Sequence, residues 1–112
     1  MLILINDIKD QELTAIDLEI NGLAVALLIW RAGAHFKIWR NQCPHAGRRL
    51  DWAPGKFLFE KGLLVCAAHG AMISLDSGRC VEGPGRGGAL TEMSFRIEDQ
   101  HIYLLLEQLD AD

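Results

Sequence analysis

Two short stretches organise this chain: Cys43-Pro44-His45 and, after a gap of 20 residues (46 to 65), Cys66-Ala67-Ala68-His69. Each stretch offers one thiol and one imidazole, two residues apart in the first and three apart in the second. Thiolates are soft anionic ligands and imidazoles are neutral nitrogen ligands, and a mixed-ligand metal centre uses both. The spacing therefore predicts a metal site that is built from two loops.

Antiparallel strands are predicted before the first ligand pair. Residues 16–20 alternate apolar and acidic side chains, which is typical of a half-buried strand, and Asn21-Gly22 is a strong hairpin signal. Residues 23–30 are all apolar and predict a strand that is buried on both faces. Residues 35–40 predict a third strand, so that the first ligand pair follows a strand end and lies on a loop.

The rest of the chain is predicted to continue as short strands and turns. In chain order we expect a strand over 63–65, a return over 70–75, a turn over 76–78, an irregular loop over 82–88 and a last hairpin that pairs 90–96 with 101–106. The tail from Glu107 onwards is expected to fray. No repeat or long amphipathic helix is visible. The predicted fold class is all-β and antiparallel.

Composition narrows the class of protein. At 112 residues, of which 50% are hydrophobic, the chain predicts a single domain over 1–112. The formal net charge of −4 argues against nucleic-acid binding, which needs a basic patch. Three cysteines are an odd number and predict a reducing compartment rather than a disulfide framework. No targeting segment is visible, and the apolar run 23–30 is too short to span a membrane, so we expect a cytoplasmic, soluble protein.

A structural zinc site is one alternative for the two ligand pairs, because zinc also accepts two cysteines and two histidines. Zinc fingers, however, usually pair cysteine with cysteine and histidine with histidine, whereas each pair in this chain mixes the two types. Mixed pairs suit two metal ions, because each loop can then give one ligand to each ion. The other alternative is that the four residues belong to a β core without any metal.

The residues around both pairs carry a family resemblance. Residues 43–52 read Cys-Pro-His-Ala-Gly-Arg-Arg-Leu-Asp-Trp, and residues 66–84 read Cys-Ala-Ala-His-Gly-Ala-Met-Ile-Ser-Leu-Asp-Ser-Gly-Arg-Cys-Val-Glu-Gly-Pro. Over nearly its whole length the chain resembles Rieske ferredoxins, in which the two irons of a [2Fe–2S] cluster have cysteine and histidine ligands respectively. The resemblance implies a Rieske-like antiparallel β sandwich or barrel with a two-loop cluster-binding subdomain at about residues 41–86.

The same resemblance implies the site residues. Cys43 and Cys66 would bind one iron of a single [2Fe–2S] cluster, and His45 and His69 the other. Close to these ligands the family pattern places Gly47, Gly70 and Ala71, and Gly83-Pro84 would cover the cluster as a third loop.

The implied function is that of a soluble one-electron carrier. We expect the chain to act as an electron-transfer protein or subunit rather than as a catalyst on its own. The leading role is a ferredoxin between a reductase and a terminal oxygenase or similar enzyme. The alternative is a small subunit of an oxidoreductase complex such as an assimilatory nitrite reductase. A complete Rieske oxygenase is disfavoured, because only His35 and His101 remain after the cluster ligands.

Several positions depart from high-potential members of the family. Their disulfide-forming cysteines are replaced by Arg48 and Ala68, and the positions of their cluster-facing Ser and Tyr hydroxyls hold Ala71 and Ile73. Loss of these donors predicts a low reduction potential.

Other positions are expected to have no special role. The 20-residue gap between the ligand pairs is slightly longer than in the shortest ferredoxins of the family, and we expect the additional residues between 52 and 61. Cys80 is expected to be a small buried hydrophobe, and Arg48 and Arg49 to be exposed and solvated.

Overall fold

A computed structural model of the chain describes residues 2–4, 7–20, 22–44, 48–67, 70–84 and 86–104, with the side chains of 2–4 and 20 excepted. Within these ranges the regular elements are strands. They are β1 (Leu2–Leu4), β2 (Leu13–Ile20), β3 (Leu23–Ala32), β4 (His35–Arg40), β5 (Leu58–Glu60), β6 (Leu63–Val65), β7 (Met72–Ile73), β8 (Cys80–Glu82), β9 (Phe95–Glu98) and β10 (His101–Leu104).

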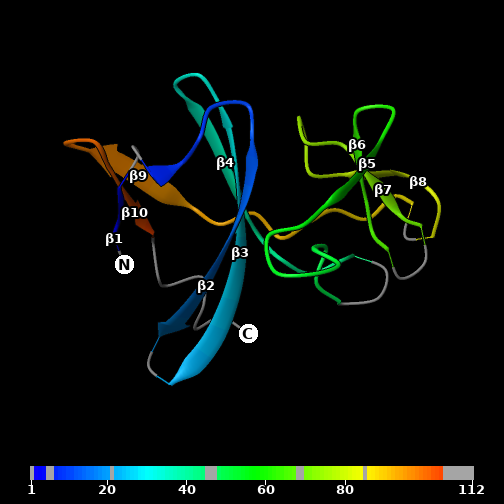
Figure 1. Cartoon of the computed structure of the whole chain (residues 1–112), viewed down its shortest axis with the longest axis horizontal. Coiled ribbons are helices and arrows are strands. Elements are labelled where there is room, and N and C mark those ends of the chain that lie inside the picture. The colour runs from blue at the N-terminus through cyan, green and yellow to red at the C-terminus, as the bar shows by residue number, and fades with distance from the viewer. Residues whose placement is uncertain are drawn as a thin grey trace.

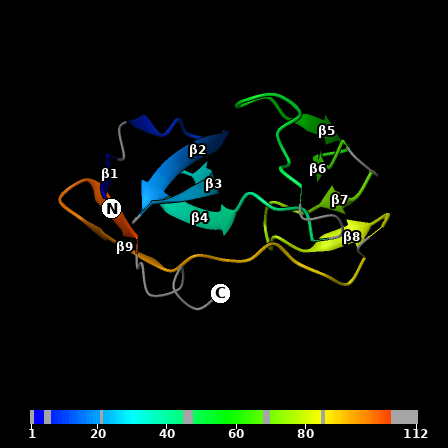
Figure 2. The same ribbon diagram turned by 90° about the horizontal axis from the view of Figure 1, so that it is seen from below.

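The strands form three antiparallel sheets. Their orders are β1-β10-β9, β2-β3-β4 and β5-β6-β7-β8. Figure 1 shows the first two sheets together on the left and the four-stranded sheet as a separate lobe on the right. We call this right-hand lobe, together with the loops between residues 41 and 57 that lead into it, the small subdomain (Figure 2). The all-β fold predicted from the sequence is confirmed.

Strand β3 is shared by two hydrophobic cores. Leu27 and Ile29 point into a core with Ile102 of β10, between the two three-stranded sheets. Leu28, which points to the other face, joins a second core together with Trp39 and the small subdomain. All three β3 side chains are fully buried, which confirms the prediction of a strand covered on both faces.

Most of the predicted strands are present, with shifted ends. The β2–β3 hairpin has Ile20 opposite Leu23, as the Asn-Gly signal requires, although Asn21 itself lies outside the described residues. The predicted return over 70–75 is shorter, because only Met72–Ile73 is strand. Strands β1 and β5, each of three residues, were not predicted. The frayed tail expected from Glu107 lies outside the described residues.

The predicted strand over 90–96 is wrong at its N-terminal end, because β9 begins only at Phe95. The segment before it instead links the two lobes. Leu90 donates its N–H to Gly78 O and is buried in the core of the small subdomain, whereas Met93 donates to Ile38 O and is buried in the other core. The apolar residues of this segment therefore satisfy two different cores and not one sheet face.

Within the part of the chain that the structure describes, no helix is long and apolar enough to cross a membrane.

Candidate functional site

The first predicted ligand loop leaves β4 and is closed at its base. Cys43 donates its backbone N–H to Arg48 O over 2.7 Å, which brings the two ends of residues 43–48 together. The Cys43 side chain is buried in the core of the small subdomain, next to the chain segment that holds buried Leu50. The backbone hydrogen bond between Cys43 and Arg48 thus closes this loop at its base, with a buried thiol at its start.

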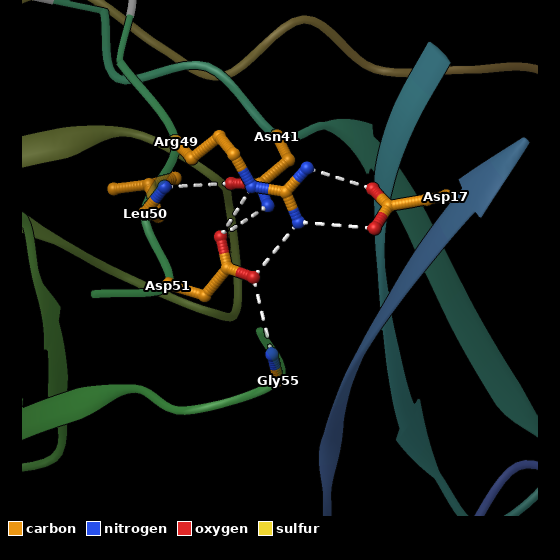
Figure 3. A network of polar contacts seen from close by, with 6 residues as sticks. All are labelled: Asp17, Asn41, Arg49, Leu50, Asp51 and Gly55. Carbon is orange, nitrogen blue, oxygen red and sulfur yellow. Dashed lines mark hydrogen bonds and ion pairs between the residues drawn. The ribbon is translucent and has the colours of Figure 1, made fainter. Parts of the chain in front are cut away.

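A buried polar network holds both ends of this loop (Figure 3). The side-chain oxygen of Asn41 accepts a hydrogen bond from Leu50 N at 2.7 Å, and its Nδ2 donates to Asp51 Oδ1 at 2.9 Å. Asp51 also accepts from Gly55 N at 3.1 Å and from Arg49, whose Nε and Nη2 each approach it at 2.9 Å. Asn41 and Asp51 are both almost fully buried.

Arg49 extends this network to the large sheet. The Nη1 group of its guanidinium donates to Asp17 Oδ1 of β2 at 2.7 Å, so that one guanidinium bridges two carboxylates from different lobes (Figure 3). The expectation that Arg49 is merely solvated is therefore wrong. Sequence reasoning could not identify the pair, because Asp17 and Arg49 are 32 residues apart and nothing in the local pattern of either one points to the other.

The network shifts the ionisation of its two charged partners. Hydrogen bonds from Arg49 hold the pKa of Asp51 well below its ordinary value, with help from Asn41 and Gly55 N and against the opposing effect of burial. The same hydrogen bonds, to Asp51 first and to Asp17 second, raise the pKa of Arg49. Asp51 is therefore a carboxylate at neutral pH, and its charge is matched inside the fold.

The second predicted ligand loop begins where β6 ends. Cys66 follows Val65 directly, its N–H donates to Ala71 O at 2.8 Å, and Gly70 N donates back to Cys66 O at 2.8 Å. Gly70 has a φ of +78°, a left-handed conformation that glycine adopts without strain. Cys66 and Ala71 are both fully buried, so this loop too begins with a buried thiol.

A third loop packs against the second. A Cβ built on Gly83 would lie 2.7 Å from Gly70 O, so only glycine allows this approach. The Cys80 thiol is buried, as expected, and its Sγ lies 3.4 Å from Glu82 O and 3.5 Å from Pro84 O, which ties the loop to β8. The structure thus places Gly83 directly against the segment that follows the second ligand pair.

Cys43 and Cys66, the two predicted thiol ligands, belong to one buried core, and none of the three cysteines forms a disulfide. Two thiols that are buried in one core, each at the start of its own loop, fit a soft metal centre. The predicted ligands His45 and His69, together with Gly47 and Ala68, lie outside the described residues. The described side chains alone contain no group of three or more histidine, cysteine or carboxylate residues that could hold an ion.

The fold and this loop arrangement have known counterparts. The family model described as a Rieske [2Fe-2S] domain matches residues 2–98. A search of curated proteins gives no sequence match. Among solved structures, the ferredoxin of carbazole 1,9a-dioxygenase from Nocardioides aromaticivorans IC177 is similar, with a TM-score of 0.65 and 17% identity over 92% of each chain.

Two further solved structures share the fold. The terminal oxygenase of carbazole 1,9a-dioxygenase from Novosphingobium sp. KA1 has a TM-score of 0.67 and 20% identity over 93% of this chain, which spans 28% of the oxygenase. A putative small subunit of an NADPH nitrite reductase has a TM-score of 0.60 and 15% identity over 93% of this chain and 94% of its own length. At these identities the likeness establishes the fold.

The buried Asp51 carboxylate predicts an acid-dependent loss of stability. Because its pKa is lowered on folding, its contribution is complete above the ordinary value of 3.8 and is lost as the pH falls further. At pH 7 we expect Asp51→Asn to cost on the order of 2 kcal/mol, or about 10 °C in melting temperature. Melting curves between pH 7 and pH 3.5 should show the difference from wild type shrinking below about pH 4.

The control is Asp17→Asn, which removes an exposed partner of Arg49 and should cost less than about 1 kcal/mol. Equal losses for both variants would contradict the central place given to Asp51.

The contact between the second and third loops gives another prediction. Gly83→Ala would push Gly83 away from Gly70 O and open the loops around the buried thiols. We expect bound iron to be lost to a chelator several-fold faster than from wild type. Gly87→Ala is the matched control, because Gly87 also has a positive φ, of +96°, but a Cβ added there would meet no atom within 4 Å. If both variants release iron equally fast, backbone strain and not the loop contact is responsible.

Proposed function

Because the chain belongs to the Rieske [2Fe-2S] domain family, which binds a [2Fe–2S] cluster, we propose that Cys43 and Cys66 hold one iron and His45 and His69 the other. The observation that carries this assignment is that both thiols are buried in one core at the starts of two closed loops. Each predicted imidazole follows its thiol by only two or three residues. When bound, the cluster supplies a one-electron redox couple.

The residues of the chain shape the surroundings of such a cluster. Leu64, Ile73 and Ala71 are fully buried in the same core as the thiols and exclude water from that side. The N–H groups of Cys43 and Cys66 are both used to close their loops. The Asn41–Asp51–Arg49 network fixes the first loop relative to β2, so that the two thiols keep their separation when the charge of the centre changes.

The role proposed for the protein is that of a ferredoxin, which receives an electron from a reductase and passes it to a terminal oxygenase or a similar enzyme. Support comes from the alignment with almost the whole of a dioxygenase ferredoxin. The alternative role, a small subunit of an oxidoreductase complex, is supported in the same way by the nitrite reductase small subunit. Purification from native cells under mild conditions separates the two: a free ferredoxin elutes as a small protein, whereas a subunit elutes with a large partner.

The cluster assignment is tested by composition and spectroscopy. Anaerobically purified protein should contain about two irons and two acid-labile sulfides per chain, following the Rieske stoichiometry. His45→Ala and His69→Ala should each abolish the electron paramagnetic resonance signal of a mixed-ligand cluster, while His35→Ala, an exposed strand residue, should not. One zinc per chain without sulfide would overturn the proposal.

The potential of the centre is expected near the low end of the Rieske range, on the order of −150 mV. Ala71 and Ile73 are buried beside the thiols and carry no hydroxyl. Ala71→Ser adds a donor there, and a hydrogen bond about 1 kcal/mol stronger in the reduced state would raise the midpoint potential by about 40 mV. Voltammetry measures the shift, with Ala89→Ser, an exposed position, as the control. A wild-type midpoint well above zero at pH 7 would contradict this account of the surroundings.

A further inference from the structure

Charge is unevenly divided along this acidic chain. The segment 41–86, which contains the small subdomain and all three loops, has six basic and four acidic residues. The remainder has five basic and eleven acidic residues. The part of the chain that carries the predicted cluster is thus positive, although the whole chain has a net charge of −4.

Two of the six basic residues of this segment are exposed arginines. Arg49 is neutralised by Asp17 and Asp51, and Lys56 lies over the Trp52 ring at 5.4 Å. Arg48 and Arg86 are exposed, and no ion pair joins either of them to another described residue.

Both of these arginines belong to the ligand-loop end of the small subdomain. Arg48 O closes the first loop on Cys43 N, and Arg86 N donates to Gly83 O in the third loop, which itself packs against Gly70. One carboxylate, Glu82, stands at the same end, where β8 leads into the third loop.

The opposite end of the small subdomain is balanced in charge. Strand β6 runs toward the second loop and β7 runs back from it, so the β5–β6 turn and the β7–β8 turn lie at the far end, at the top of this lobe in Figure 1. Lys61 and Arg79 of these turns are accompanied there by Glu60 and Asp76. Within the segment, Arg48 and Arg86 against Glu82 leave a net charge of +1 at the ligand-loop end, and Lys56 carries the other positive charge.

We propose that this end, with exposed Arg48 and Arg86, is the docking face for a protein redox partner whose contact surface is acidic. The proposal rests on the proposed function, because the electron must leave where the cluster is held. At physiological ionic strength charges are screened over roughly 8 Å, so a partner in contact with this end responds to its two arginines more than to any acidic residue beyond that distance. Complementary charge of this kind accelerates encounter and orients short-lived complexes.

A compact acidic protein fits this surface better than an extended polyanion. Nucleic acids and anionic membranes present continuous negative charge and would meet the acidic remainder of the chain as well as the two arginines. A partner with a small acidic patch can contact the ligand-loop end alone, and small interfaces are typical of electron-transfer pairs.

Two small oxidants of opposite charge test the electrostatic potential at the ligand-loop end without a known partner. Reduced protein gives one electron to hexacyanoferrate(III), forming hexacyanoferrate(II), or to hexaammineruthenium(III), forming the ruthenium(II) ion. We expect the second-order rate constant with the anionic oxidant to fall as sodium chloride is raised, and that with the cationic oxidant to rise. The opposite dependence, which the net charge alone would give, overturns the proposal.

Charge-reversal variants assign the effect to residues. The double variant Arg48→Glu, Arg86→Glu should slow reduction of hexacyanoferrate(III) at least three-fold at low salt and should lower the midpoint potential, because positive charge near the centre favours its reduced form. The control, Lys61→Glu with Arg79→Glu, changes the net charge equally at the far end and should alter the rate less than two-fold. Equal effects of the two double variants would overturn the proposal.

The remaining outcomes are distinguishable. Protein that contains no [2Fe–2S] cluster, by iron and sulfide content, overturns the proposed function and the docking face with it. Intact cluster with the wrong salt dependence overturns the docking face alone. Sedimentation of wild-type protein, but not the Arg48→Glu, Arg86→Glu variant, with phosphatidylserine vesicles would identify a membrane surface in place of a protein partner.

Discussion

Burial of β3 on both faces is the constraint on which the two-lobed structure depends. Successive side chains of a strand point to opposite faces, and Leu27 and Leu28 therefore enter different cores. Trp39 of neighbouring β4 enters the same core as Leu28. The ligand loops are thus built on one face of a sheet whose other face is packed against a second sheet.

The buried Asp51 carboxylate also joins the two lobes, through its ion pair with Arg49. A carboxylate that is removed from water is stable only when its hydrogen-bonding capacity is filled, and Asn41, Arg49 and Gly55 N fill it. Because Arg49 also contacts Asp17, the first ligand loop is fixed to β2 as well as to its own base. A centre that gains and loses an electron benefits from ligands that do not move with each change of charge.

The small subdomain divides its polar residues between two tasks. Arg49 is engaged within the fold, where its charge is matched, while its neighbour Arg48 is exposed at the loop end, where its charge is available to a partner. In the proposed docking, these two adjacent arginines therefore have different roles. This division agrees with a carrier that must keep its centre rigid and its contact surface free for brief encounters.

Much of this protein was determined by local sequence patterns. The alternation in β2, the Asn-Gly turn and the apolar run of β3 are properties of neighbouring residues, and they correctly predicted the hairpin, the all-β class and a strand covered on both faces. The spacing of the cysteines and histidines is also a property of neighbouring residues, and it predicted two ligand loops. In the structure each of these loops begins with a buried thiol. The roles of His45 and His69 stay a prediction.

Only the tertiary structure decided what depends on residues far apart. Strand β1 forms by pairing Leu2–Leu4 with β10, almost at the other end of the chain, and three apolar residues give no periodicity to reveal it. The segment around Leu90 looked like a strand but serves two cores, and Arg49 looked solvated but bridges two lobes. In each case the free energy comes from partners that folding brings together, and no pattern within the segment contains them.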